Sequence, residues 1–162
     1  MVDKLSHEDR SENMRRIRSK NTAPELAVRR YVHGAQLRYQ LHRRNLAGCP
    51  DLVFPSRRIC VFVNGCFWHG CSKCVDGRRA VKSNRVYWTA KVRGNRKRDK
   101  RNQKALEADG WGVLTIWECE TSDPAHLAAL VEAIRAAPPS PRRARTNLRP
   151  AGGGRSRDGA AA

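Results

Sequence analysis

The apolar and polar positions of this 162-residue chain repeat with two different periods, which predicts both helices and strands. Spacings of three to four residues, opened by residues that cap helix N-termini, predict four helices. They run over about 6–19, 24–33, 87–109 and 124–136. The sequence Thr22-Ala-Pro-Glu25 is the clearest helix start, because proline suits the first turn and Glu25 can reach back to the cap.

Alternation with a period of two, or a short apolar run, predicts four strands. They cover about 37–41, 51–54, 59–63 and 113–117. The second and third are nearly all apolar and are joined by the turn 55–58, which predicts a hairpin at the centre of a sheet. The order of these elements predicts one α/β domain over residues 1–137.

The composition changes at Pro138 to proline, arginine, glycine and alanine, which cannot form a core. Residues 138–162 are therefore expected to be a disordered tail. Its arginines could add non-specific attraction for phosphate, but a solubilising extension is the simpler interpretation.

The formal charge of +18, from 33 Lys and Arg against 15 Asp and Glu, is typical of proteins that bind polyanions. Nucleic acid is the expected partner. Membrane binding is not expected, because the chain has no apolar run of spanning length and no basic amphipathic anchor. The first ten residues are polar, so we predict no secretory signal and a cytoplasmic location.

Four of the six cysteines are placed to bind one metal ion. Cys66, Cys71 and Cys74 lie within nine positions, and Cys119 follows the last predicted strand, which could return it to the same place. In a reducing compartment such clusters bind metal more often than they form disulfides. Four thiolates make a closed, structural zinc site. His69 is a fifth candidate ligand, so counting alone leaves the set open.

Asp51 begins a buried strand, where a carboxylate is costly unless it is paired or bound to a cation. Mg²⁺ is the natural cation for phosphodiester cleavage, although a loop-capping role fits Asp51 equally well. His69, held beside a metal-bound turn, would suit a general base. Considered alone, His69 is more simply a zinc ligand or a structural histidine. Cys60, in an apolar strand, is expected to be a core residue.

Aromatic residues occur beside a dense positive run. Phe67 and Trp68 precede His69, Trp88 opens the third predicted helix, and residues 91–104 carry eight cations against one acid. Aromatics beside phosphate-binding cations can wedge between bases, although in small proteins they are more often core. Phe67 and Trp68 would point to opposite sides of an extended backbone, so at least one is expected to face solvent or DNA.

Several short motifs occur together between about residues 11 and 134. They are Pro50-Asp51, Asn64-Gly-Cys-Phe-Trp-His69, Arg98-Asp99, Gly110-Trp111 and Trp117-Glu-Cys119. This combination resembles the very-short-patch (Vsr-type) DNA mismatch endonucleases. The resemblance implies a restriction-endonuclease-like mixed sheet flanked by helices, with a structural zinc site. It also implies a nick 5′ of the thymine in T·G mismatches left by deamination of 5-methylcytosine.

The resemblance assigns catalytic roles to matching positions. Asp51 would hold Mg²⁺, Val63 would offer its backbone carbonyl to the same ion, and His69 would activate water. Glu25 falls where the family has an acid near the active site, although capping explains it equally well. Asn64 stands where some members carry a histidine proposed to assist the leaving group, so that proton transfer is expected to be absent.

The resemblance also assigns zinc and DNA contacts. Cys66 and Cys119 match zinc ligands, and completion of the set by Cys71 and Cys74 is our inference from their chemistry, because some members use a histidine there. Residues expected to contact DNA are the wedge aromatics and two cations of the basic run: Phe67, Trp68, Trp88, Arg96 and Arg98.

Together these observations predict a Mg²⁺-dependent DNA endonuclease that starts very-short-patch repair. It is expected to act as a monomer in the bacterial cytoplasm, associated with the nucleoid, on double-stranded DNA that contains a mismatch. A mismatch-repair coordinator and a repair polymerase are the implied protein partners. The rival hypothesis is a non-catalytic zinc-stapled nucleic-acid-binding module, and Asp51 and His69 distinguish the two.

Overall fold

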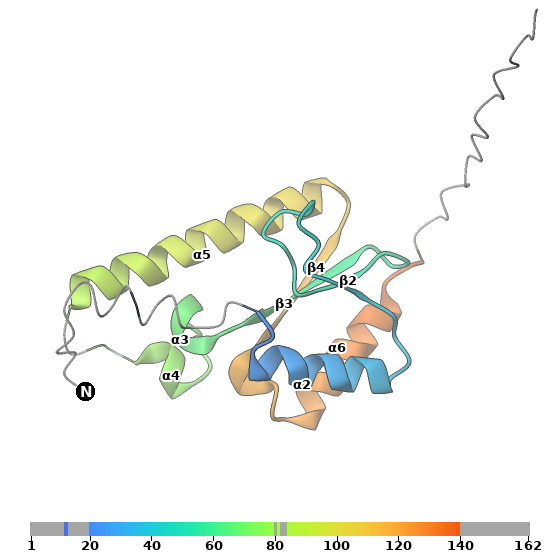
Figure 1. The fold of residues 1–162 in the computed structure, drawn as a ribbon, viewed down its shortest axis with the longest axis horizontal. Helices are drawn as coiled ribbons and strands as arrows, with labels where there is room; N and C mark the ends of the chain where they lie inside the picture. The colour runs from blue at the N-terminus through green and yellow to red at the C-terminus, as the bar shows by residue number, and fades with distance from the viewer. Residues whose placement is uncertain (1–11, 13–19, 80, 82–83, 140–162) are drawn as a thin grey trace, which may run out of the picture.

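A computed structural model describes residues 12, 20–79, 81 and 84–139 of the chain. Its centre is a four-stranded sheet in the order β1-β2-β3-β4 (Figure 1). Strands β1 and β3 each pair antiparallel with β2, and β4 runs parallel to β3. The strands are β1 (Gln40–Leu41), β2 (Leu52–Phe54), β3 (Ile59–Asn64) and β4 (Gly112–Trp117).

Helices flank this sheet (Figure 1). The long helices are α2 (Ala23–Gly34), α5 (Arg85–Ala108) and α6 (Pro124–Ala136). Shorter pieces are α3 (Cys66–His69), α4 (Val75–Arg78) and the 3₁₀ helix η1 (Glu118–Glu120). Helices α2 and α6 pack against each other, whereas α5 lies apart from them and contacts α3 and β4.

Side chains alternate between two core clusters, because successive residues of a strand point to opposite faces of the sheet. Leu52 and Phe54 of β2 join the cluster made with α2 and α6, which includes Val28 and Ile134. Val53, between them, faces the smaller cluster, which is closed by Leu46, Cys60 and Leu106. The nearly all-apolar hairpin is therefore buried on both faces, and its strands are central, as the sequence predicted.

The predicted elements agree closely with the observed ones in the longer helices and the hairpin. Helix α6 has the predicted bounds, and α2 extends one residue beyond the prediction at each end. Only Gln40 and Leu41 of the strand predicted at 37–41 pair with β2, and His42, with a positive φ of 45°, ends the strand directly after them. The helix predicted at 6–19 falls outside the described residues except for residue 12, and so does the tail from residue 140 onward.

The parallel pairing of β3 with β4 decides where the chemistry lies. Asn64 pairs with Trp117, so the segments that follow both strands leave the sheet at one edge. Cys66 follows Asn64 by two residues, and Cys119 follows Trp117 by two. The expectation that the last strand returns Cys119 to the other cysteines is therefore confirmed.

Among the described helices, none is both long and apolar enough to cross a membrane.

Candidate active site and metal centre

Four cysteine side chains meet at the edge of the sheet where β3 and β4 end. The Sγ atoms of Cys66, Cys71, Cys74 and Cys119 all lie within 4.8 Å of one another, and those of Cys71 and Cys119 are 4.0 Å apart. In a tetrahedral zinc site with Zn–S bonds of about 2.3 Å, the sulfurs are roughly 3.8 Å apart. The cluster therefore has the composition and the size of a Cys₄ zinc site. His69 is not part of it.

The backbone around the cluster is arranged to stabilise thiolates. The N–H groups of Cys119, Lys73 and Gly77 donate to the Sγ atoms of Cys66, Cys71 and Cys74, each at 3.4 Å. The bond from Gly77 lowers the pKa of Cys74, whereas burial raises the pKa of Cys66 and that of Cys119, so these thiolates need a cation as well. Donors of this kind orient and tune metal-bound sulfur.

Glycine is required at position 77 for a steric reason. A Cβ atom there would lie 2.2 Å from the carbonyl oxygen of Cys71, which belongs to the backbone and cannot move aside easily. The close approach of α4 to the cysteine loop therefore depends on this glycine.

The other two cysteines lie apart from the cluster. Cys60 is fully buried in the smaller core cluster, which confirms the prediction of a core residue, and burial raises the pKa of its thiol to about 11. Cys49 lies at the edge of the neighbouring cavity.

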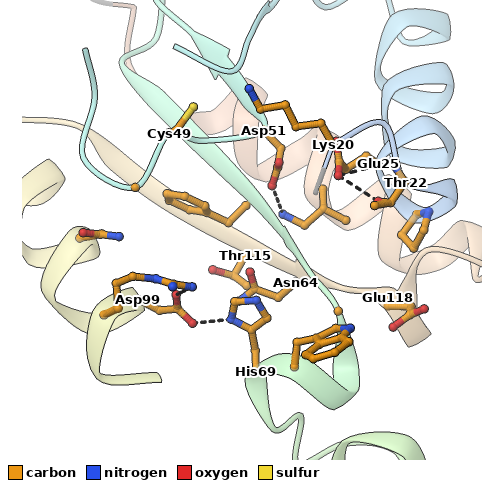
Figure 2. Close-up of a pocket in the computed structure, with 18 of the residues that line it drawn as sticks. Lys20, Thr22, Glu25, Cys49, Asp51, Asn64, His69, Asp99, Thr115 and Glu118 are labelled. Atoms are coloured by element: carbon orange, nitrogen blue, oxygen red, sulfur yellow. Dashed lines mark hydrogen bonds and ion pairs between the residues drawn. The ribbon is translucent and has the colours of Figure 1, made fainter. Parts of the chain in front are cut away.

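A cavity of about 710 Å³ adjoins the metal centre and collects the predicted catalytic residues. Asp51 enters it from the start of β2, His69 from the end of α3, and Glu25 from the first turn of α2 (Figure 2). Val63 and Asn64 line it from the end of β3. Residues that are distant in sequence therefore share one solvent-connected space.

Asp51 is held at one oxygen and constrained by burial. Its Oδ2 accepts the backbone N–H of Val63 at 2.8 Å (Figure 2). Burial raises the pKa of Asp51 to about 6, and the nearby charge of Glu25 adds to the rise. A buried carboxylate of this kind is stabilised by a cation, so the side chain fits the role of a metal ligand.

His69 and Asp99, which both line the cavity, form a close pair. Nδ1 of His69 lies 2.5 Å from Oδ2 of Asp99 on α5 (Figure 2). A carboxylate can only accept, so Nδ1 carries the proton and the neutral ring keeps its lone pair on Nε2. A carboxylate that fixes the histidine tautomer in this way is the arrangement by which a general base is oriented.

Glu25 is occupied at both oxygens. Its Oε1 accepts from the hydroxyl of Thr22 at 2.9 Å, and its Oε2 accepts from the backbone N–H of Asn21 and from Arg29 at 2.8 Å. Oε1 also accepts the backbone N–H of Thr22 at 3.5 Å, which is the capping-box contact of α2 that the sequence indicated. Glu25 thus faces the cavity while it caps the helix.

His42 joins this group from the residue after β1. Its Nε2 lies 2.9 Å from Nη2 of Arg29, and its Nδ1 lies 3.9 Å from Oδ1 of Asp51. Burial and the charge of Arg29 lower the pKa of His42. Glu25, His42 and Asp51 consequently form a compact donor group.

The predicted DNA-contact aromatics form one cluster. The Phe67 ring lies 5.2 Å from that of Trp68 and 5.3 Å from that of Trp88. The premise that Phe67 and Trp68 lie on an extended backbone was wrong, because α3 turns this segment into a helix and their rings pack edge to face. Both rings nevertheless remain partly exposed.

The aromatic cluster separates two cavities. Trp68 lines the cavity of Asp51, whereas Phe67 and Trp88 line a second cavity, also of about 710 Å³. Arg98 lies in the first and Arg96 in the second, so the two predicted cations occupy different sides of α5. The second cavity is bordered by further cations of α4 and α5: Arg78, Arg79, Arg85, Arg93, Lys97 and Lys100.

Sequence reasoning missed two residues of the first cavity. Asp99 carried a usable signal, since it is the single acid in the basic run of 91–104 and lies in a matched motif. His42 carried none, because nothing in its neighbourhood distinguishes it from a surface histidine.

Comparisons with known proteins identify the family of this chain. The family model described as DNA mismatch endonuclease Vsr matches residues 2–75. The type II nicking enzyme V.XorIIP of Xanthomonas oryzae pv. oryzae (strain KACC10331 / KXO85) is 50% identical over 135 residues, which cover 83% of this chain and 96% of that protein. The chain belongs to the Vsr family.

More distant relatives carry similar names. The type II nicking enzyme V.NmeAIP of Neisseria meningitidis serogroup A / serotype 4A (strain DSM 15465 / Z2491) is 38% identical over 125 residues, covering 77% of this chain and 88% of that protein. The DNA mismatch endonuclease Vsr of Escherichia coli (strain K12) is 34% identical over 119 residues, covering 74% of this chain and 75% of that protein. The chain is therefore a DNA endonuclease of this family.

Proposed function

We propose that this protein is a Mg²⁺-dependent mismatch endonuclease that nicks DNA 5′ of the thymine in T·G mismatches and so starts very-short-patch repair. The observation that carries the proposal is the meeting of Asp51 and the His69–Asp99 pair in one cavity. This is the combination of a cation-binding carboxylate and an oriented base that phosphodiester hydrolysis needs.

Asp51 and the backbone carbonyl of Val63 would hold the metal ion. The donor set fits a hard cation, because carboxylate and carbonyl oxygens are the ligands that Mg²⁺ prefers and the cavity leaves room for water and phosphate. Bound Mg²⁺ would supply Lewis-acid stabilisation of the charge that develops on the phosphate.

His69 would take the proton of the attacking water at Nε2. Asp99 holds Nδ1 and stabilises the imidazolium that results. Asn64 offers no titratable group to the leaving oxygen, so this chain's own contribution to the reaction is concentrated on the water side of the phosphate. Solvent that enters the cavity would be the remaining source of the leaving-group proton.

Recognition of the mismatch would depend on the aromatic cluster. A T·G pair stacks poorly, so inserting Phe67, Trp68 and Trp88 beside it costs less than inserting them into intact duplex. Arg96 and Arg98 would hold phosphates on the two sides of α5. This arrangement supports selectivity through the deformability of DNA.

The remaining elements of the proposal concern organisation. A restriction-endonuclease-like catalytic domain would occupy residues 1–137, with zinc as a structural ion on the four cysteines and residues 138–162 as a tail. The protein would act as a monomer in the bacterial cytoplasm, at the nucleoid. A mismatch-repair coordinator and a repair polymerase would use the nick.

A nicking assay tests the proposal. Duplexes with one T·G pair, a T·A pair or another mismatch are incubated with Mg²⁺ and the wild-type protein, Asp51→Asn or His69→Ala. Wild type is expected to cut one strand 5′ of the mismatched thymine, and both variants are expected to bind the same duplex without cutting. A wild-type protein that binds but never nicks would favour the rival, a non-catalytic zinc-stapled binding module.

A further inference from the structure

His42 lies where three elements meet beside the metal-binding carboxylate. It follows β1, faces α2 through Arg29 and Glu25, and lines the same cavity as Asp51. Its side chain is 16% exposed and contacts Arg29, and its backbone has a positive φ of 45°, a conformation in which histidine is one of the more frequent residues after glycine. The fold therefore holds this imidazole in one place.

The contacts of His42 define which ring nitrogen carries the proton. Arg29 can only donate, so Nε2 of His42, 2.9 Å from Nη2 of Arg29, must accept. The proton of the neutral ring then sits on Nδ1. That nitrogen lies 3.9 Å from Oδ1 of Asp51, while the other oxygen of Asp51 accepts from the N–H of Val63.

The same contacts leave His42 no free ring lone pair for a metal ion, and they give Glu25 a cationic partner in Arg29. The lone pair of Nε2 and an oxygen of Glu25 are both occupied by the guanidinium of Arg29, which supplies the positive charge that a cation would otherwise bring. In contrast, Oδ1 of Asp51 faces the Nδ1–H of His42 at 3.9 Å, which is too long for a hydrogen bond. A hydrogen bond between them requires Oδ1 to come about 1 Å closer to Nδ1.

We propose that His42 is a positioning residue, which relays the fixed geometry of Arg29 on α2 to Asp51 by presenting its Nδ1–H to Oδ1. The carboxylate would then be oriented by two donors, Val63 and His42, with its remaining lone pairs directed at the cation. Residues that orient a metal ligand in this way affect metal affinity or activity by about 10- to 100-fold. The inference rests on the proposed Mg²⁺-dependent nicking.

Two substitutions of His42 by neutral amides test its two ring nitrogens separately. His42→Asn keeps a donor near the position of Nδ1 and loses the acceptor for Arg29, whereas His42→Gln keeps an acceptor near Nε2 and loses the donor toward Asp51. Neither change adds charge. Asparagine tolerates a positive φ, and Gln36 of this chain adopts one as well, at 61°. Differences between the variants therefore report on polarity more than on backbone fit.

The experiment measures kcat, KM for a T·G duplex and the Mg²⁺ concentration at half-maximal rate, together with calorimetric titration of Mg²⁺ into each protein. His42→Gln is expected to weaken Mg²⁺ binding or lower kcat by about 10-fold or more with KM within about twofold of wild type, and His42→Asn to retain most of both. Asp51→Asn supplies the baseline without the carboxylate.

Equal behaviour of the two variants, whether both are normal or both are equally impaired, would overturn the role of the Nδ1–H. A loss confined to KM or to the melting temperature would do the same, because it would show a structural residue. Failure of the wild-type protein to nick is a different result: it would remove the proposed function, while the calorimetric comparison would still decide whether His42 acts on metal binding at Asp51.

Discussion

The cysteine cluster and the candidate active-site cavity lie next to each other but are assembled in different ways. Three of the four cysteines come from one short segment, and a single parallel strand pair brings the fourth. The cavity instead takes Glu25 from α2, His42 from the end of β1, Asp51 from β2 and Asp99 from α5. The first region is largely local, and the second is wholly tertiary.

This difference has a physical consequence for stability and function. A closed thiolate site gains its free energy from the metal and fixes the turn that carries Phe67, Trp68 and His69. The cavity, in contrast, concentrates a buried carboxylate and strained or crowded polar groups, which cost stability. We therefore expect the cysteine cluster to stabilise the fold, and the cavity residues to serve the reaction at some cost in stability.

The largest expected effect is the loss of stability when the proposed zinc site loses a ligand. Cys71→Ser removes a fully buried ligand and should lower the free energy of unfolding by on the order of 5 kcal/mol or more, since structural zinc contributes about 10 kcal/mol in small zinc domains. Chemical denaturation and zinc analysis of the purified protein would measure it. Cys49→Ser, outside the cluster, is the matched control and should keep both zinc and stability. Full stability in Cys71→Ser would show that the cluster is not a staple.

The next effect separates catalysis from folding. Asp99→Asn removes the carboxylate that fixes His69 and should lower kcat by roughly 10²- to 10⁴-fold, with DNA affinity and melting temperature nearly unchanged. Single-turnover nicking and duplex binding would measure the two quantities. Glu107→Gln, on an exposed part of the same helix, should have no effect. An unimpaired Asp99→Asn would mean that His69 needs no orienting partner.

The smallest effect is the loss of folding stability that the buried charge of Asp51 causes in the Mg²⁺-free protein. The carboxyl of Asp51 has a pKa of about 6 in the folded protein, against an ordinary value of 3.8, so the folded state binds more protons between these values. The proton that the folded state binds at Asp51 stabilises the fold, and this contribution is complete below pH 3.8. It is lost as the pH rises through 6, which lowers the free energy of unfolding by at most about 3 kcal/mol.

Asp51→Asn should therefore be more stable than wild type at pH 8 without metal, and equally stable near pH 4. Thermal unfolding at both pH values measures this difference, in buffer that lacks Mg²⁺ and contains no chelator, because a chelator would also remove the zinc. Added Mg²⁺ should narrow the gap at pH 8 by stabilising the wild-type carboxylate alone. A variant that is less stable than wild type at every pH would show that Asp51 contributes to folding as well as to chemistry.

The sequence by itself determined the three long helices α2, α5 and α6, the buried hairpin and which cysteines are candidates for a metal site. Helix bounds follow from local signals such as the capping box at Thr22 and Glu25, and α6 was predicted to the residue. The hairpin follows from its apolar arms, and the cluster from cysteine spacing. The one-turn helix α3 was missed, because a segment of four residues has too few turns to show helical periodicity.

Only the tertiary structure decided the polarity of the cavity. Asp99 and His69 are thirty positions apart, and the crossing of α5 over α3 brings them into contact. The link from Arg29 through His42 to Asp51 needs α2, the turn after β1 and β2 at once. Local patterns record which residues prefer a helix, a strand or a metal. Hydrogen-bond partners across a cavity are set by chain topology, which no short window of the sequence contains.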